Sequence, residues 1–130
     1  MSPVNTKRPQ KKKRKKHGKS ILQPKEDKRC ILCMLLHDDY REKFVHEHHV
    51  MYGKNHQISE ELGLKVNLCP DHHQHGPEAV HRNHEIDELL KDIAQRRFEE
   101  LHSHEEWWKE FDQNFYAEDS IWDIYKKNMG

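Results

Sequence analysis

The sequence is poor in apolar residues and has no long apolar run. Only 33% of its 130 residues are hydrophobic, while 35% are charged. No stretch approaches the roughly 20 apolar residues of a membrane helix, and no apolar segment follows the basic N-terminus as in a secretory signal. We therefore expect neither a membrane span nor export. A chain this polar buries little apolar surface, so a metal is expected to help hold a single domain together.

Cysteine is scarce as well, and the three cysteines are an odd number. Two of them form the short motif Cys30-Ile-Leu-Cys33. Without an export signal the chain is expected in a reducing, cytoplasmic interior, where clustered cysteine and histidine indicate metal more often than disulfide.

The net charge is zero, but the two signs are separated along the chain. Residues 1–29 hold 12 Lys and Arg against two acidic residues, and the remaining 101 residues hold 11 basic against 21 acidic ones. A dense basic run of this kind favours contact with nucleic acid, although a solvated tail or, in a nucleated cell, a nuclear address has the same composition. The predicted DNA-binding residues are Lys11, Lys12, Lys13, Arg14, Lys15 and Lys16.

Composition and periodicity divide the chain into three parts. Residues 1–27 are rich in lysine and proline and are expected to be a disordered basic tail; residues 28–116 form the expected domain, and residues 117–130 an aromatic C-terminal tail for packing or for a partner. Within the domain we expect a small α+β fold with a helical C-terminal half. The expected elements are a metal-binding knuckle over 28–36 with Ile31 and Leu32 at its tip, strands over 43–50 and 64–68, a short helical turn opened by Ser59 and ended by Gly63, a helix from Glu85, and a second helix capped by Ser103.

The strongest motif is a pair of metal-binding spacings. Cys30-x2-Cys33 and Cys69-x2-His72 each place two ligands on one turn, and four such ligands complete a tetrahedron around zinc. His73 is an alternative to His72 as the fourth ligand, although the spacing favours His72. A zinc ion with four protein ligands is structural, because it has no open position for water.

The histidines are in excess of what this zinc site needs. The chain has 13, and several follow the two knuckles: His46, His48 and His49 in the first predicted strand, and His73, His75, His81 and His84 after the second knuckle. On a strand His46 and His48 share one face while His49 points to the other. Imidazoles grouped beside a zinc knuckle can hold a second metal with open positions.

These residues resemble a known enzyme motif. Two knuckles that bracket a strand with a His-His pair, followed by a histidine just after the last zinc ligand, are similar to the HNH (ββα-metal) nuclease motif. The stretch from Cys30 to Tyr116 resembles more closely the phage-encoded RecA-dependent nucleases related to the recombination-enhancement protein Ref. The matching pieces are Cys-x2-Cys, Glu47-His48-His49-Val50, Gly53, Ser59, Gly63-Leu64, Val66-x-Leu68-Cys69, His72-His73, Gly76-Pro77, Val80-His81 and the segment from Phe111 to Tyr116.

The resemblance implies a fold, cofactors and residue roles. The fold implied is a zinc-stabilised ββα-metal core. His49 takes the place of the general base, whose ordinary pKa of about 6.5 suits that role. His48, His73 and His81 take the places of ligands for a second, catalytic metal ion, which would be magnesium, manganese or zinc.

Two departures from the motif stand out. His48 replaces the usual Asp, which favours softer divalent ions over magnesium. The middle Asn of the motif is expected at position 64, which is Leu64, so the residue that orients the base is open among His46, Asn67 and Asn83.

Two functional hypotheses follow. The first is a metal-dependent DNA endonuclease of phage or prophage recombination in the cytoplasm of a bacterial host, whose cutting the resemblance links to RecA filaments on single-stranded DNA. The second is a non-catalytic zinc-ribbon-like module that binds DNA or a partner. The His48-His49 pair together with His73 separates them, because a pure zinc module needs none of the three.

Overall fold

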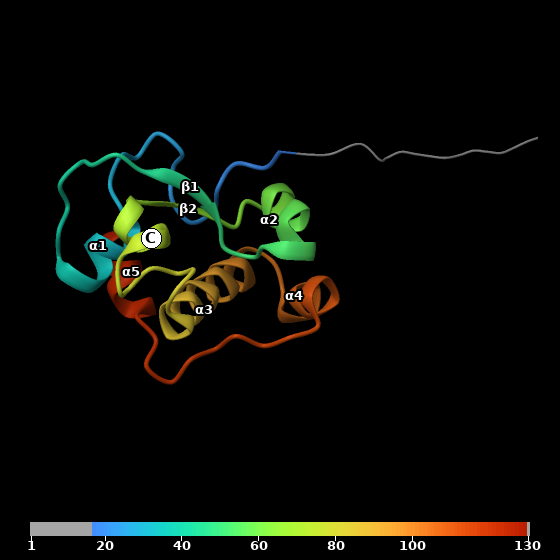
Figure 1. The fold of residues 1–130 in the computed structure, drawn as a ribbon. Coiled ribbons are helices and arrows are strands. Elements are labelled where there is room, and N and C mark those ends of the chain that lie inside the picture. The colour runs from blue at the N-terminus through green and yellow to red at the C-terminus, as the bar shows by residue number, and fades with distance from the viewer. Residues whose placement is uncertain (1–16, 130) are drawn as a thin grey trace, which may run out of the picture.

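The computed structural model describes residues 17–129, in which short helices surround one two-stranded sheet. Figure 1 shows the sheet lying over the longest helix, with two helices at either side of it. In chain order the elements are α1 (Ile31–His37), β1 (His46–His49), the 3-10 turn η2 (Gly53–Asn55), α2 (His56–Leu62), β2 (Lys65–Leu68), the π-helical turn η3 (Asp71–His75), α3 (His84–Leu101), α4 (His104–Phe111) and α5 (Trp122–Asn128). The expectation of a small α+β fold with a helical C-terminal half is confirmed.

The two strands pair antiparallel, with His46 opposite Leu68 and His48 opposite Val66. Both are four residues long, shorter than the predicted strand over 43–50 but close to the one over 64–68. The β2 side chains are buried throughout. The sheet therefore fixes the two consecutive histidines of β1 against a buried partner strand.

Helix α3 lies below the sheet in the view of Figure 1. Asn83 caps its first turn, because the side-chain oxygen accepts hydrogen bonds from the amides of Glu85 and Ile86. Its apolar stripe buries Leu90 and Ile93 in the core. The predicted second helix is also confirmed, with the Ser103 side chain capping α4.

The C-terminal residues belong to the folded body. Tyr125 on α5 is buried and donates its hydroxyl hydrogen bond, 2.7 Å long, to the carbonyl of Leu22. The buried Asp92 carboxylate on α3 accepts hydrogen bonds from the Ala117 amide and the Ser120 hydroxyl. Of the two roles left open for the aromatic tail, packing is the one that the structure shows for Tyr125.

The metal-binding segment after Lys28 differs from the expected knuckle. Residues from Ile31 onward form helix α1, and Ile31 and Leu32 lie fully buried in its first turn rather than at the tip of a turn. The predicted short knuckle over 28–36 is therefore a helix from residue 31, because Cys-x2-Cys spacing also fits the start of a helix, which the apolar pair Met34-Leu35 extends.

The short helix before β2 begins earlier than predicted. It begins at His56 rather than at Ser59, whose side chain is buried and donates to the Leu64 carbonyl at 2.7 Å. Its end at Gly63 is as predicted, because Gly63 has a φ of 75°, a left-handed conformation that suits glycine.

The folded body also extends N-terminal of the predicted boundary after residue 27. Leu22 and Gln23 are buried, and the Asn67 side chain donates to the carbonyls of Pro24, Lys25 and Asp27. The predicted DNA-binding run from Lys11 to Lys16 lies outside the described residues. Among residues 17–129, no helix is both long enough and apolar enough to cross a membrane.

Candidate metal and catalytic site

Four predicted zinc ligands meet at the junction of α1, β2 and η3. Cys30 precedes α1 and Cys33 lies in its first turn, while Cys69 follows β2 and His72 lies in η3. The π-helical turn closes on Cys69, whose carbonyl accepts hydrogen bonds from the amides of His72 and His73. All four side chains are buried and form one group able to hold a metal ion.

The spacing of the ligand atoms fits tetrahedral zinc. His72 Nδ1 lies 3.4 Å from the sulfurs of Cys30 and Cys33 and 3.5 Å from that of Cys69, and the Cys33 and Cys69 sulfurs are 3.9 Å apart. Bonds of about 2.3 Å to sulfur and 2.0 Å to nitrogen give tetrahedral edges of about 3.5 Å (S to N) and 3.8 Å (S to S). The group therefore has both the chemistry and the size of a closed zinc site.

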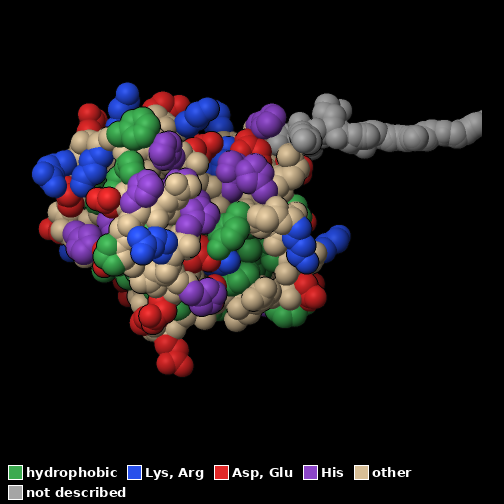
Figure 2. All heavy atoms as spheres, in the orientation of Figure 1, with side chains coloured by type: hydrophobic (Ala, Val, Ile, Leu, Met, Phe, Trp, Pro, Cys, Tyr) green, Lys and Arg blue, Asp and Glu red, His purple; other side chains and the backbone are tan. Residues whose placement is uncertain are grey.

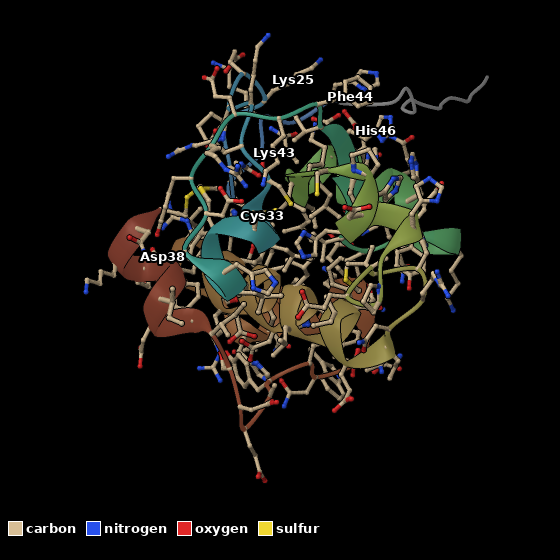
Figure 3. All side chains as sticks on the ribbon, turned by 60° about the vertical axis from the view of Figure 1, so that its left-hand side comes forward. Lys25, Cys33, Asp38, Lys43, Phe44 and His46 are labelled. Carbon is tan, nitrogen blue, oxygen red and sulfur yellow. The ribbon has the colours of Figure 1, made fainter. Side chains whose placement is uncertain are left out.

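Neighbouring charges support this group. His72 Nε2 faces the Glu78 carboxylate at 3.3 Å, which leaves Nδ1 for the metal. Lys43 Nζ donates to the Cys33 sulfur at 3.3 Å, and Figure 3 shows the two residues close together.

Burial raises the pKa of the Cys30 thiol to about 12 and also raises that of Cys33. Metal uptake must therefore displace thiol protons.

A second group of three histidines lies beside the first. It contains His48 of β1, His73 of η3 and His81, whose ligand nitrogens all lie within 4.8 Å of one another. The backbone causes this convergence, because the Val80 amide donates to the His72 carbonyl at 2.9 Å and the His81 amide to the His73 carbonyl at 3.4 Å. The loop after η3 thus returns along it and places His81 next to His73.

The second group is more open than the first. His48 is 4% exposed, His73 is half-buried and His81 is exposed. Figure 2 shows several histidine side chains on the face of the molecule that it draws. His48 Nε2 is buried and has no hydrogen-bond partner, although buried polar atoms nearly always have one.

Burial and neighbouring charges favour the neutral form of His48 and His73. Burial, followed by the neighbouring charges of His73 and His81, lowers the pKa of His48 to about 3. Burial also lowers the pKa of His73, with His81 contributing next. Neutral imidazole is the form that binds a metal. His48 therefore has an unused nitrogen at neutral pH.

The remaining histidines of the two sequence groups lie around this centre. The His46 ring is 5.6 Å from the His73 ring and packs edge-on against the exposed Phe44 (labelled in Figure 3). His75 and His84 are exposed and are not members of the three-histidine group.

His49, the predicted general base, has its own set of contacts. Its Nε2 lies 2.7 Å from the Glu60 carboxylate of α2, and its ring is 3.9 Å from the His56 ring. The charge of His49 contributes to lowering the pKa of His48. The two consecutive histidines are therefore near enough to interact while facing different partners.

None of the three candidates for orienting His49 makes a recorded hydrogen bond to it within residues 17–129. Asn67 holds the segment before α1, Asn83 caps α3, and His46 contacts Phe44 and His73. Glu60 is the partner instead. Glu60 lies inside the predicted short helical turn from Ser59 to Gly63, and no periodicity or spacing in the sequence links it to His49, 11 residues away.

A polar network borders the three-histidine group on the α3 side. The Tyr52 ring is 6.0 Å from His48 and 5.7 Å from His81, and its hydroxyl donates to Asp87 at 3.0 Å. Lys91 Nζ lies 3.0 Å from Asp87 and 4.9 Å from the centre of the Tyr52 ring. The network supplies a cation near the histidines.

Comparison of the chain with protein-family models, curated proteins and solved structures returns no match. The assignment of a function therefore depends on the residues themselves. What they establish is a small α+β body with a buried Cys/His group able to hold a metal such as zinc.

Proposed function

We propose that this protein is a metal-dependent DNA endonuclease of the HNH type. The observation that carries the proposal is the buried, unpartnered Nε2 of His48 within a group of three histidines, next in sequence to His49. A closed Cys/His site beside the group supplies the scaffold, so the histidines are not needed for zinc-dependent folding. An excess of neutral imidazoles in a half-open group is typical of a site with coordination positions left for substrate.

In this proposal each histidine has a distinct role. His48, His73 and His81 hold a divalent ion, which when bound neutralises charge on the scissile phosphate and stabilises the leaving oxygen. His49 accepts a proton from the water that attacks phosphorus as the phosphorus–oxygen bond to the leaving group breaks. Softer ions than magnesium are favoured because all three ligands are nitrogen.

DNA is the proposed substrate because of the charge on the N-terminal residues. His17, the first described residue, has its Nδ1 3.0 Å from the Glu60 carboxylate, which also contacts His49. His17 directly follows the basic run from Lys11 to Lys16 in the sequence, and it lies beside the carboxylate that contacts the proposed base. Deleting residues 1–16, which hold eight Lys and Arg, should leave the fold intact and reduce the magnitude of the slope of log K against log salt by up to about 7. An unchanged slope would exclude this run as a DNA contact.

The test of the proposal is DNA cleavage by wild type and His49→Ala. The zinc-loaded protein is incubated with supercoiled and single-stranded DNA, with magnesium or manganese, and with or without a RecA filament. His49→Ala should lower the cleavage rate about 100- to 10,000-fold, because proton transfer by a positioned base contributes that much. Zinc content, folding and DNA affinity should be unchanged. His75→Ala, an exposed histidine outside the three-histidine group, is the matched control.

Two results would contradict the proposal. If His49→Ala cuts as fast as wild type while a chelator stops cutting, the base is another residue. If wild type cuts under no condition while zinc and DNA binding are both present, the protein is a zinc-dependent binding module.

A further inference from the structure

Glu60 is the charged centre of a small network beside β1. Its carboxylate lies 2.7 Å from His49 Nε2, 3.1 Å from Lys65 Nζ and 3.0 Å from His17 Nδ1. These partners come from β1, β2 and the segment before α1. One carboxylate thus connects three parts of the chain next to the proposed base.

The position of Glu60 is fixed by backbone contacts on both sides. The Glu60 carbonyl accepts a hydrogen bond from the Gly18 amide at 3.0 Å, and the Gly63 carbonyl accepts one from the Ile21 amide at 2.9 Å. A Cβ atom on Gly18 would lie 2.3 Å from the Glu61 carbonyl oxygen, so this close approach requires glycine. The carboxylate therefore projects from a firmly anchored turn.

The chemistry of the pair determines which nitrogen of His49 carries the proton. The hydrogen bond from His49, together with those from His17 and Lys65, lowers the pKa of Glu60 to about 2. An ionised carboxylate only accepts hydrogen bonds. Nε2 of His49 must therefore be the donor, which leaves Nδ1 of the neutral ring as the acceptor for a proton.

A cation held by Glu47, His49 and Glu60 is the rival interpretation, because their ligand atoms also lie within 4.8 Å of one another. The charges around Glu60 oppose it. The Lys65 ammonium, whose side chain is 8% exposed, already pairs with the carboxylate. A metal ion would have to displace a buried positive charge or lie beside it.

We propose that Glu60 is a positioning residue that holds His49 in the Nε2–H tautomer and in one orientation. It replaces the Asn that the HNH resemblance led us to expect. The catalytic part of this inference rests on the proposed endonuclease function, whereas the tautomer does not.

The direct test is the nitrogen NMR spectrum of the His49 ring in zinc-loaded protein with magnesium. Long-range proton–nitrogen correlations distinguish the two tautomers, and wild type should show Nε2–H. Glu60→Gln should give a mixture, because an amide can either accept from or donate to the ring. Glu61→Gln is the matched control, since the neighbouring Glu61 bonds only to Gln57 among the side chains of residues 17–129.

The kinetic test is single-turnover cleavage by the same variants. Glu60→Gln should lower the maximal rate about 10- to 10,000-fold, up to the whole contribution of the base, because His49 in the wrong tautomer cannot accept the proton; DNA affinity should be unchanged. Glu61→Gln and Glu47→Gln should cut like wild type. Circular dichroism and zinc content establish that each variant is folded.

The outcomes separate the two proposals. An Nδ1–H tautomer in wild type, or a Glu60→Gln variant that cuts within twofold of wild type, would overturn the positioning role. Equal losses in Glu47→Gln and Glu60→Gln, together with loss of a bound cation, would show a metal site instead. If wild type does not cut at all, the endonuclease proposal fails, and the NMR spectrum still decides whether Glu60 sets the tautomer.

Discussion

The Cys/His group and the three-histidine group of this small protein differ in how buried they are, although both include a residue of the turn η3. His72 enters a buried group with three thiols, whereas its neighbour His73 enters a half-open group with two other histidines. In the first group the four ligand atoms lie in contact with one another. In the second group the buried Nε2 of His48 has no hydrogen-bond partner. The turn η3 thus sends two adjacent histidines into different groups, which under the proposed function would serve folding and chemistry separately.

Breaking the closed group should have the largest effect. Cys30→Ser should lose zinc and cooperative folding together, because metal binding at structural sites supplies about 10–16 kcal/mol that is coupled to folding. Zinc analysis and thermal unfolding by circular dichroism measure both. A Cys30→Ser variant with a sharp transition and native helicity would show that the closed group is not what holds the fold.

The neighbouring pair His72 and His73 offers the sharpest contrast between the groups. His72→Ala should lose zinc and fold poorly, whereas His73→Ala should keep zinc and its thermal transition and lose only binding of the second metal and cleavage. Excess manganese should partly rescue His73→Ala, and it should not rescue His49→Ala. Similar unfolding of both alanine variants would mean that the two groups form one structural site.

Glu78 should have a smaller effect, confined to the closed group. Glu78→Gln removes the carboxylate facing His72 Nε2 and should weaken zinc binding about 10- to 100-fold. Competition with a chromophoric zinc chelator measures the affinity. Binding of the second metal should not change, and a parallel loss there would argue that the groups are coupled.

The smallest expected difference between the two groups is the number of protons that each releases when it binds a metal ion. The raised pKa values of Cys30 and Cys33 mean that these thiols are protonated at pH 7, so zinc must displace a proton from each. Burial lowers the pKa values of both His48 and His73, so these rings are neutral at pH 7, and His48, with a pKa of about 3, stays neutral as the pH falls through 6.5. Adding manganese to the zinc-loaded protein should release almost no protons from them. Calorimetry in buffers of different ionisation enthalpy counts the protons, and equal release at the two sites would contradict the assignment.

Local patterns predicted much of this molecule. The Cys-x2-Cys and Cys-x2-His spacings identified the four members of the closed group, and periodicity with capping residues identified α3 and α4. The approach of His81 to His73 was suggested only by the family resemblance, and in the structure it depends on backbone hydrogen bonds that have no sequence signature.

Longer-range features were not predictable. Glu60 and His49 are brought together by the packing of α2 on β1, and a glutamate in a short polar helix looks like any exposed residue. The boundary of the folded body was placed at residue 28 because lysine and proline dominate the preceding segment. Leu22 and Gln23 nevertheless pack into the body, since Asn67 and Tyr125 hold their neighbourhood.

The central proposal, that this small domain holds two metal ions at sites of different kind, is tested most directly by counting metals during graded chelation. Mass spectrometry under native conditions should find one zinc that resists a mild chelator and one divalent ion that is lost readily. His48→Ala should lose only the second ion and keep its zinc and fold. A wild-type protein that never holds more than one metal ion, or that loses both together, would contradict the account.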